Sequence, residues 1–307
     1  MAEREETRKT IERLRREIER HEALYRKAHQ PEISDPAFDR MLRELQDLEA
    51  AHPEFASGDS PTRRVGDDRV RGFPTARHLV PMQSLDNTYS RDELFEFDRR
   101  LRRLLGTESP EYRVEPKIDG LAICLTYRDG RYEKAVTRGN GEEGDVVTDN
   151  VRTIHSLPGE LKGDGLPRLI EIRGEVYMTR AEFDRINAER AREGRDPYMN
   201  PRNLASGTLK QLDAAEVARR KLEIVCYGVG AVEGLHFSQQ QEIVERFADW
   251  GLPVVETSWT TRGIAQAWEA VQELEERMAQ FAYATDGAVL KLNDIEGQRR
   301  AGSTSKA

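Results

Sequence analysis

The chain has 307 residues, of which 34% are charged and 37% are hydrophobic, so it is long enough for two domains and can bury a substantial core. Its formal net charge of −8 argues against tight nucleic-acid binding by this chain alone, because phosphate contacts need a surplus of Lys and Arg on one face. No apolar run approaches the roughly 20 residues that cross a bilayer and the first residues lack a signal-peptide pattern, so we expect a cytoplasmic protein that does not enter a membrane.

A helical hairpin is predicted at the start of the chain. Apolar residues recur at helical spacing from about residue 3 to residue 28, and a second apolar stripe follows Asp35 and Pro36, which suit the N-cap and the first turn of a helix. Capping explains Asp35, whereas Asp39, one turn later, is less well explained by it. Gly, Pro, Asp and Ser gather between residues 52 and 74, which predicts a linker and a domain boundary near residue 70.

The remainder is predicted as a mixture of helices and antiparallel strands. Strands are expected at 112–127, 132–137, 168–178, 221–230 and 283–292. Helices are expected at about 91–105, 179–192, 238–250 and 262–277, with a long loop at 194–211. The sequence therefore indicates an α+β protein, with a helical hairpin domain over residues 1–70 and a domain of antiparallel sheets flanked by helices over residues 71–307.

Neither cysteine indicates a disulfide or a metal site. Cys124 and Cys226 each lie within an apolar, strand-like run, which predicts buried reduced thiols. No metal-ligand spacing is present, and we expect no metal-ligating residues.

The stretch KIDG at 117–120 places a lysine where an apolar strand pattern begins, at the rim of a predicted sheet. Lysine becomes a nucleophile when its ammonium lies in a desolvated or cation-rich site, so Lys117 is a candidate for covalent chemistry. A surface lysine before a β-hairpin turn explains the same four residues, and the motif alone favours that simpler interpretation.

Other charged stretches also have simple interpretations. The glycine-rich loop at 137–145 includes Arg138, which could contact an anion, but its acidic residues favour a turn first and a ligand site second. Glu171, Arg173 and Glu175 alternate along one strand, as on the solvent face of a sheet. The basic run at 99–103 is typical of a solvated helix face with acidic partners.

Six motifs in one order carry more information than any one of them. They are KIDG at 117–120, TRGNG at 137–141, RGEV at 173–176, NPRN at 200–203, CYGVG at 226–230 and DGAVLK at 286–291. This series, with the hairpin before it, closely resembles the N-terminal half of bacterial NAD⁺-dependent DNA ligases over essentially the whole chain. The resemblance implies a helical NMN-binding domain followed by an adenylation (nucleotidyltransferase) domain, an ATP-grasp-like ligase fold.

The resemblance also implies roles for individual residues of the larger domain. Lys117 would attack the α-phosphorus of NAD⁺, release nicotinamide mononucleotide (NMN) and hold AMP, and Asp119 would support this lysine and the AMP. The remaining implied contacts are Glu115 with adenine, Arg138 and Glu175 with the ribose and its neighbourhood, Tyr227 stacked on the base, Ser84 and Leu85 in the wall of the pocket, and Lys291 reaching the nucleotide from the last strand.

In the hairpin, the resemblance implies contacts with the NMN half of NAD⁺. Asp35 and Asp39 match the carboxylates that recognise this half, Tyr25 matches an aromatic residue that stacks on nicotinamide, and Phe38 stands where a second tyrosine is usual. Phe38 can stack but cannot donate a hydroxyl hydrogen bond, so NAD⁺ binding or the first step is expected to be weaker than is usual in the family. Further departures are Arg26 in place of a second aromatic residue or His, His29 in place of an aspartate and Lys210 in place of an arginine, which loses a bidentate fork.

The chain ends just before the family's last motif, and the OB-fold, zinc-finger, helix-hairpin-helix and BRCT portions do not follow, so an expression fragment is expected. The expected activity is adenylation with NAD⁺ and Mg²⁺, for the sealing of nicked double-stranded DNA in replication and repair through domains outside this chain. We expect a monomer. Two alternatives stay open: an ATP-dependent ligase or capping-type nucleotidyltransferase, and a catalytically impaired paralogue that holds NAD⁺ or DNA ends.

Overall fold

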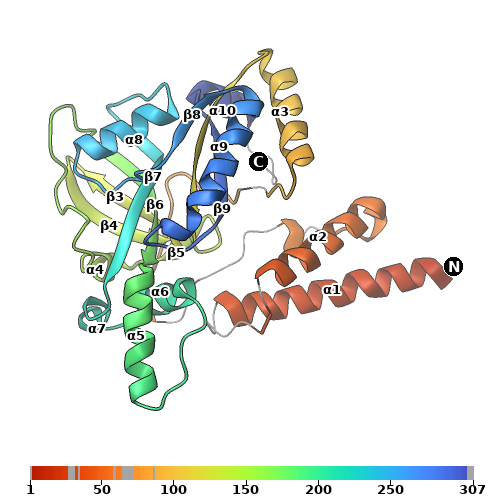
Figure 1. The fold of residues 1–307 in the computed structure, drawn as a ribbon, viewed down its shortest axis with the longest axis horizontal. Coiled ribbons are helices and arrows are strands. Elements are labelled where there is room, and N and C mark those ends of the chain that lie inside the picture. The colour runs from red at the N-terminus through yellow and green to blue at the C-terminus, as the bar shows by residue number, and fades with distance from the viewer. Residues whose placement is uncertain are drawn as a thin grey trace.

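A computed structural model describes residues 2–26, 32–33, 35–57, 60–63, 69, 72–85 and 87–302. In these residues the chain forms a helical hairpin and a larger part in which helices surround three antiparallel sheets (Figure 1). The predicted α+β class is confirmed.

The N-terminal hairpin consists of α1 (Ala2–Arg26) and α2 (Asp35–Ala51). Its core is a small apolar cluster made of Ile11, Leu14, Ile18 and Leu45. Glu49 closes the end of the hairpin because it accepts hydrogen bonds from the Arg15 guanidinium and from the hydroxyls of Ser60 and Thr62, each hydroxyl at 2.6 Å. These hydroxyls lie at the start of a short 3₁₀ helix (Pro61–Arg63), which follows another (Pro53–Phe55).

The larger part contains three sheets in which all neighbouring strands are antiparallel. The two-stranded sheet pairs β1 (Thr75–Arg77) with β5 (Glu143–Asp145). The three-stranded sheet has the order β8 (Trp259–Arg262), β2 (Glu111–Ile118), β9 (Thr285–Leu292). The four-stranded sheet has the order β4 (Arg131–Thr137), β3 (Leu121–Arg128), β6 (Leu169–Met178), β7 (Leu222–Glu233).

The helices of the larger part pack around these sheets, as Figure 1 shows. They are α3 (Arg91–Leu105), α4 (Thr148–Val151), α5 (Arg180–Arg192), α6 (Pro201–Leu209), α7 (Ala214–Ala218), α8 (Gln240–Asp249), α9 (Gly263–Arg277) and α10 (Ile295–Ala301), with a 3₁₀ turn at Met278–Gln280. Residues of α3, α9 and β2 share one apolar core, and the four-stranded sheet has a second, larger core.

Strand β2 presents two different faces. Tyr112 and Val114 are fully buried in the core shared with α3 and α9. Side chains alternate along a strand, so Arg113, Glu115 and Lys117 lie on the opposite face. That face becomes one wall of the candidate site.

Several sequence-based expectations were wrong in detail. Lys117 lies near the end of β2 and does not open the following strand, because residues 112–127 divide into β2 and β3 at the Asp119–Gly120 turn. The predicted loop at 194–211 contains α6, which begins where the side chain of Asn200 accepts a hydrogen bond from the Asn203 amide at 2.8 Å. Proline at the first helical position supports this start.

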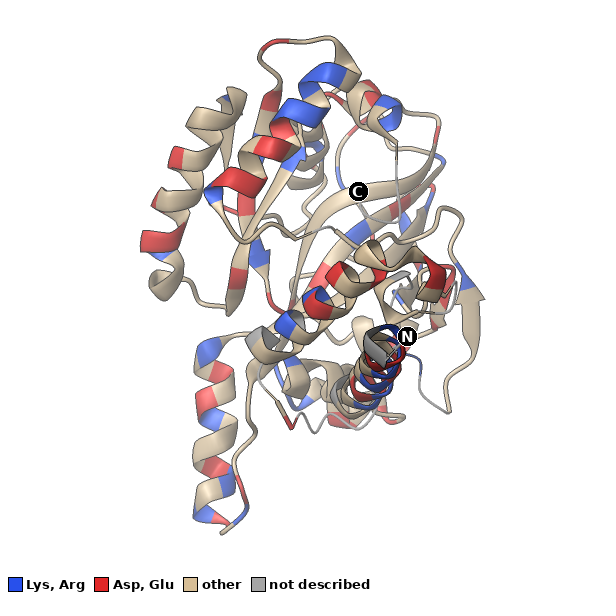
Figure 2. Cartoon of the chain, turned by 90° about the vertical axis from the view of Figure 1, so that its right-hand side faces the viewer, with Lys and Arg blue, Asp and Glu red and all other residues tan. Residues whose placement is uncertain are grey.

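The charged face predicted for 171–175 is also not a solvent face. Glu171 and Arg173 are buried, and Glu175 is half-buried. Cys124 and Cys226 are free and buried, as predicted. Acidic and basic residues are interspersed along the helices in Figure 2, and Arg99 pairs with Glu96 in α3 as expected for a solvated helix face. No described helix is both long and apolar enough to cross a membrane.

Candidate active site

Lys117 lies at an irregularity between β2 and β9. Pro116 pairs with Ala288 and Ile118 pairs with Thr285, so β9 carries an extra residue opposite Lys117. Bulges of this kind re-aim side chains at the edge of a sheet. Here the bulge sets the Lys117 ammonium against the Asp286 carboxylate in an ion pair, with both side chains about one-third exposed. A primary amine is therefore held, partly exposed, near the end of β2.

The turn after Lys117 joins the two larger sheets at close range. A Cβ on Gly120 would lie 2.3 Å from the Val176 carbonyl oxygen and 2.9 Å from the Glu175 side chain, so only glycine lets this turn approach β6. Asp119 is fixed in the turn because its carboxylate accepts a hydrogen bond from Arg202 Nη1 at 3.0 Å. Helix α6 thereby contributes a guanidinium beside the lysine.

Glu175 is the acidic centre of this group. Burial raises the pKa of the Glu175 carboxyl to about 7, and the nearby cations Arg202, Arg138 and Lys117 oppose this rise in that order of strength. Three cations from separate parts of the chain thus act on one half-buried carboxylate, and two of them, Lys117 and Arg202, also pair with Asp286 and Asp119. Ammonium and guanidinium groups placed in this way can pair with the oxygens of a phosphate-bearing ligand.

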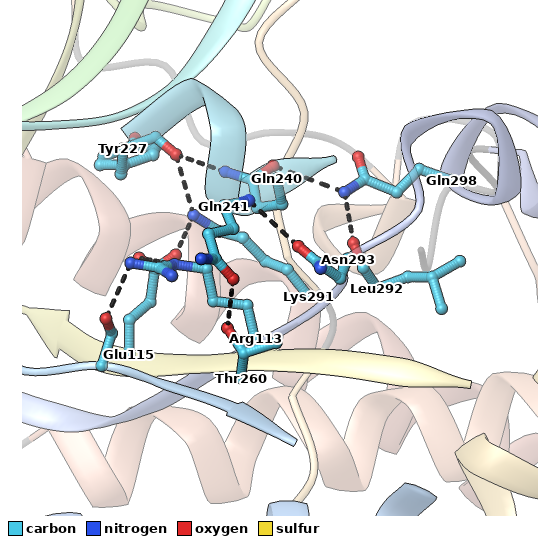
Figure 3. Close-up of polar contacts among 11 residues, drawn as sticks. Arg113, Glu115, Tyr227, Gln240, Gln241, Thr260, Lys291, Leu292, Asn293 and Gln298 are labelled. Atoms are coloured by element: carbon cyan, nitrogen blue, oxygen red, sulfur yellow. Dashed lines mark hydrogen bonds and ion pairs between the residues drawn. The ribbon is translucent and has the colours of Figure 1, made fainter. Parts of the chain in front are cut away.

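A second group of polar residues gathers around Tyr227 and Lys291 (Figure 3). Lys291 forms an ion pair with the buried Glu115, donates a hydrogen bond to the Tyr227 carbonyl oxygen at 3.1 Å, and lies 4.9 Å from the centroid of the Tyr227 ring. Tyr227 is half-buried, and burial raises the pKa of its phenol, with Glu175 and Arg138 among the charges it senses. An aromatic face, a carboxylate and an ammonium therefore lie together next to Glu175.

The backbone amide and the backbone carbonyl of Arg138 each have a polar contact. Its amide donates to the Ala122 carbonyl oxygen at 3.1 Å, and its carbonyl oxygen lies 3.1 Å from His78 Nε2. Its Nε is buried with no hydrogen-bond partner among the described residues. The loop after it is the predicted turn: Asn140 Oδ1 accepts two backbone amides at 3.0 Å, and Gly139 has a φ of +60°.

A buried anchor holds the segment before α3 against the sheet. The Glu171 carboxylate accepts the amides of Leu79 at 2.9 Å and Val80 at 3.2 Å, and Arg173 donates to the Val80 carbonyl oxygen. His78, Cys124 and Glu171 offer ligand atoms within 4.8 Å of one another. Because the Glu171 carboxylate is already engaged by backbone amides and by Arg173, this cluster is a structural anchor.

The expected wall residues follow this anchored segment. Ser84 and Leu85 are both exposed, with Leu85 at 57%. Met82, two residues earlier, is buried and donates its amide to the Gly141 carbonyl oxygen at 2.8 Å, which ties the segment to the glycine-rich turn.

In the hairpin, Phe38 is half-buried and packs on the small core of the hairpin itself. The side chains of Tyr25, Asp35 and Asp39 lie outside the described residues, as does that of Arg26, and so does His29 as a whole. Lys210, at the end of α6, is buried with its Nζ 3.7 Å from the carboxylate of the buried Asp145.

Sequence reasoning assigned no role to Arg202, which contacts Asp119, or to Asp286, which contacts Lys117. Both lie inside motifs that were recognised, NPRN and DGAVLK, so the signal was present. The contacts depend on α6 and on the β9 bulge, neither of which was predicted.

Comparison with known families accounts for nearly the whole chain. A model of the NAD-dependent DNA ligase adenylation domain matches residues 70–307, and one of the DNA ligase-like, N-terminal NAD+-binding domain matches residues 4–66. DNA ligase 1 of Opitutus terrae is 54% identical over 98% of this chain and 46% of its own length. The DNA ligase of Trichlorobacter lovleyi is 44% identical over 96% of this chain and 43% of its own length. The chain thus spans about half the length of these relatives.

Solved structures are more distant. A mycobacterial DNA ligase D complexed with ATP and MES has a TM-score of 0.38 at 13% identity, covering 70% of this chain and 55% of that chain. The ATP-dependent DNA ligase of bacteriophage T7 in complex with ATP has a TM-score of 0.36 at 14% identity, and the match covers 70% of this chain and 63% of that chain. Similarity this low says nothing about what the chain does. The family matches do: the chain belongs to the NAD-dependent DNA ligase adenylation-domain family and carries the N-terminal NAD⁺-binding domain before it.

Proposed function

We propose that this chain performs the adenylation step of an NAD⁺-dependent DNA ligase, with Lys117 as the nucleophile. The observation that carries the proposal is the position of Lys117, which pairs with Asp286 and lies two residues before Asp119, itself held by Arg202 of α6. An amine among other cations is suited to attack at phosphorus, because these cations also balance the charge of the phosphates.

The reaction forms one bond and breaks another. The Lys117 ammonium gives up protons to solvent, to which it is about one-third exposed, and its nitrogen forms an N–P bond to the α-phosphorus of NAD⁺, while the P–O bond to the NMN phosphate breaks and NMN leaves. Asp286 holds the ammonium in place before attack. Asp119, itself held by Arg202, lies two residues from the nucleophile and supports the adenylate.

The rest of NAD⁺ is assigned to neighbouring residues. Adenine would stack on Tyr227 with Glu115 at its edge, Glu175 and Arg138 would hold the ribose and its surroundings, and Lys291 would reach the nucleotide. Ser84 and Leu85 would line the pocket from the segment anchored by Glu171. Lys291 now pairs with Glu115 over the Tyr227 ring, so a base that entered here would have to displace its ammonium.

The NMN half is assigned to the hairpin, where Tyr25, Asp35, Phe38 and Asp39 would recognise it. This assignment requires the hairpin to act as a separate unit, and we propose a boundary near residue 70. The family match to an N-terminal NAD⁺-binding domain over residues 4–66 supports it.

Magnesium is proposed as a companion of the phosphates. Asp119 and Asp286 already face cations, so these carboxylates do not form a preformed cage for a divalent ion. Mg²⁺ commonly takes most of its ligands from substrate phosphates and water, so the phosphates of NAD⁺ and water would hold the ion here. The ion would neutralise phosphate charge.

Transfer of the adenylate to a 5′-phosphate at a DNA nick, and a role in replication and repair, are proposed for the longer protein that the relatives represent. For this chain we propose a monomer. Neither the ATP-dependent nor the inactive alternative is favoured, because the matching families are NAD-dependent and all six motifs are present in the chain.

The test is a donor comparison. With NAD⁺ labelled in its adenylate, the chain should gain label and release an equal amount of NMN, whereas labelled ATP should give no adduct. Lys117→Ala should abolish labelling, and Lys162→Ala, at an exposed lysine, should leave it unchanged. Equal labelling from ATP, or label that survives Lys117→Ala, would refute the proposal.

A further inference from the structure

Arg113 is a buried cation to which the adenylation step assigns no task. Its side chain is 8% exposed, and its Nη2 donates to Ser258 Oγ at 2.7 Å. Its Nε has no hydrogen-bond partner among the described residues and lies 4.0 Å from Glu115 Oε2. Burial of a guanidinium with an incomplete set of partners is costly, so a reason for its position is expected.

The reason lies in the geometry of β2 and β9. Arg113 and Glu115 share a face of β2, and Arg113 lies directly opposite Lys291 on β9. Figure 3 shows the three side chains meeting beside Tyr227. One buried carboxylate therefore lies between two cations, with Oε1 facing Lys291 and Oε2 facing Arg113. If Lys291 turns toward a bound nucleotide, Arg113 still balances the charge of Glu115.

We propose that Arg113 is a positioning residue that makes the site selective for adenine over 6-oxopurines. This inference rests on the proposed function, because it places adenine at Glu115. A charged carboxylate only accepts hydrogen bonds, so it pairs with the 6-amino group of adenine and repels the 6-carbonyl oxygen of hypoxanthine. Without a fixed counter-charge, a buried carboxylate can turn away or take up a proton, and a protonated carboxyl can donate to that carbonyl.

The test compares NAD⁺ with nicotinamide hypoxanthine dinucleotide, using the full chain. The equilibrium Kd for each dinucleotide is measured by calorimetry without Mg²⁺, so that adenylate transfer does not consume NAD⁺ during the titration. The wild type should bind NAD⁺ more tightly. In Arg113→Met the ratio of the two Kd values should fall by about tenfold or more, because sites that discriminate by hydrogen bonding lose selectivity when the polar group is no longer fixed.

Three further variants separate selectivity from structure. Arg113→Lys should restore much of the ratio, and Arg168→Met, at an exposed arginine paired with Glu233, should leave it unchanged. Ser258→Ala removes the other partner of the guanidinium and should lower the ratio by a smaller factor, which keeps the test available if Arg113→Met does not fold.

An Arg113→Met protein that binds both dinucleotides more weakly by the same factor would overturn the inference, as would a wild type that binds both equally. Label transfer from NAD⁺ to Lys117 is followed in parallel. Failure of that transfer with selective binding retained would overturn the proposed function and leave adenine selection standing.

Discussion

Glu175 has the most unusual environment among the acidic residues at the candidate site. It lies on β6 beside the turn that carries Asp119, and burial raises the pKa of its carboxyl to about 7 although Arg202, Arg138 and Lys117 oppose that rise. The carboxyl can thus change its protonation state near neutral pH, at the point where three cations meet. This behaviour follows from chain segments that meet only in the fold, so alternation along one strand could not predict it.

The raised pKa predicts a pH dependence of stability. Between about pH 4.5, the ordinary value, and about pH 7, the folded chain retains a proton that the unfolded chain has lost. The free energy of unfolding should therefore fall as the pH rises through this window, and Glu175→Gln, which cannot titrate, should lack this loss. The free energy of unfolding of the variant, relative to that of wild type, should rise by about 2 kcal/mol between pH 5 and pH 8, as urea unfolding can measure.

Glu133→Gln is the matched control, because Glu133 is a half-exposed glutamate on β4, two strands away from β6 in the same sheet. The difference in the free energy of unfolding between Glu133→Gln and wild type should be the same at both pH values. A Glu175→Gln variant whose difference from wild type is the same at both pH values would contradict the prediction.

At the scale of elements, the sequence predicted what depends on local patterns. The helix at 91–105 is α3 with the same bounds, and most strands lie within a few residues of their expected positions. It did not predict α6, although the Asn–Pro pair at 200–201 was a start signal. Nor could it predict the bulge at Lys117 or the burial of Glu171, whose amide partners Leu79, Val80 and Ala231 are 60 or more residues away in the chain.

Helix α6 matters because it carries Arg202 to Asp119. Asn200→Ala removes the N-cap of this helix and should lower the free energy of unfolding by about 1 kcal/mol. It should also slow adenylation, because Arg202 is displaced from Asp119. Asp213→Ala, which removes the N-cap of α7, should cost a similar amount of stability without slowing the reaction. Equal rates in the two variants would show that the position of α6 does not matter for the chemistry.

A buried ion pair links α6 to the two-stranded sheet. Lys210 and Asp145 are both buried, 3.7 Å apart, where the resemblance led us to expect an arginine. Removing one partner of a buried pair leaves a charge that lacks compensation, so Lys210→Met should destabilise the chain by about 3 kcal/mol. Lys210→Arg should lower the free energy of unfolding by much less. Urea unfolding of both variants measures this difference. Similar stability of both variants would indicate that the charge of residue 210 is not needed.

On the scale of the whole molecule, the hairpin and the larger part have separate apolar cores. Contacts between them include Arg43 of α2, which pairs with Glu93 of α3 and lies 5.1 Å from the centroid of the Tyr89 ring. These side chains are about one-third to one-half exposed, and exposed pairs contribute little to stability. The two parts are therefore expected to fold independently.

A chain that starts at residue 72 should test this independence. It should unfold cooperatively, with a free energy of unfolding within about 1 kcal/mol of that of the corresponding transition in the full chain. Because the proposed NMN contacts lie in the hairpin, it should not take up adenylate from NAD⁺. Loss of cooperative unfolding would show that the larger part depends on the hairpin, and full activity would remove the hairpin from the reaction.

The most direct measurement is mass spectrometry of the whole chain and of its peptides after incubation with NAD⁺ and Mg²⁺. The chain should gain the mass of one adenylate, on the peptide that contains Lys117, and Lys117→Arg should gain none. An adenylate found on another residue, or the same gain in mass in the Lys117→Arg protein, would contradict the assignment of this lysine as the nucleophile.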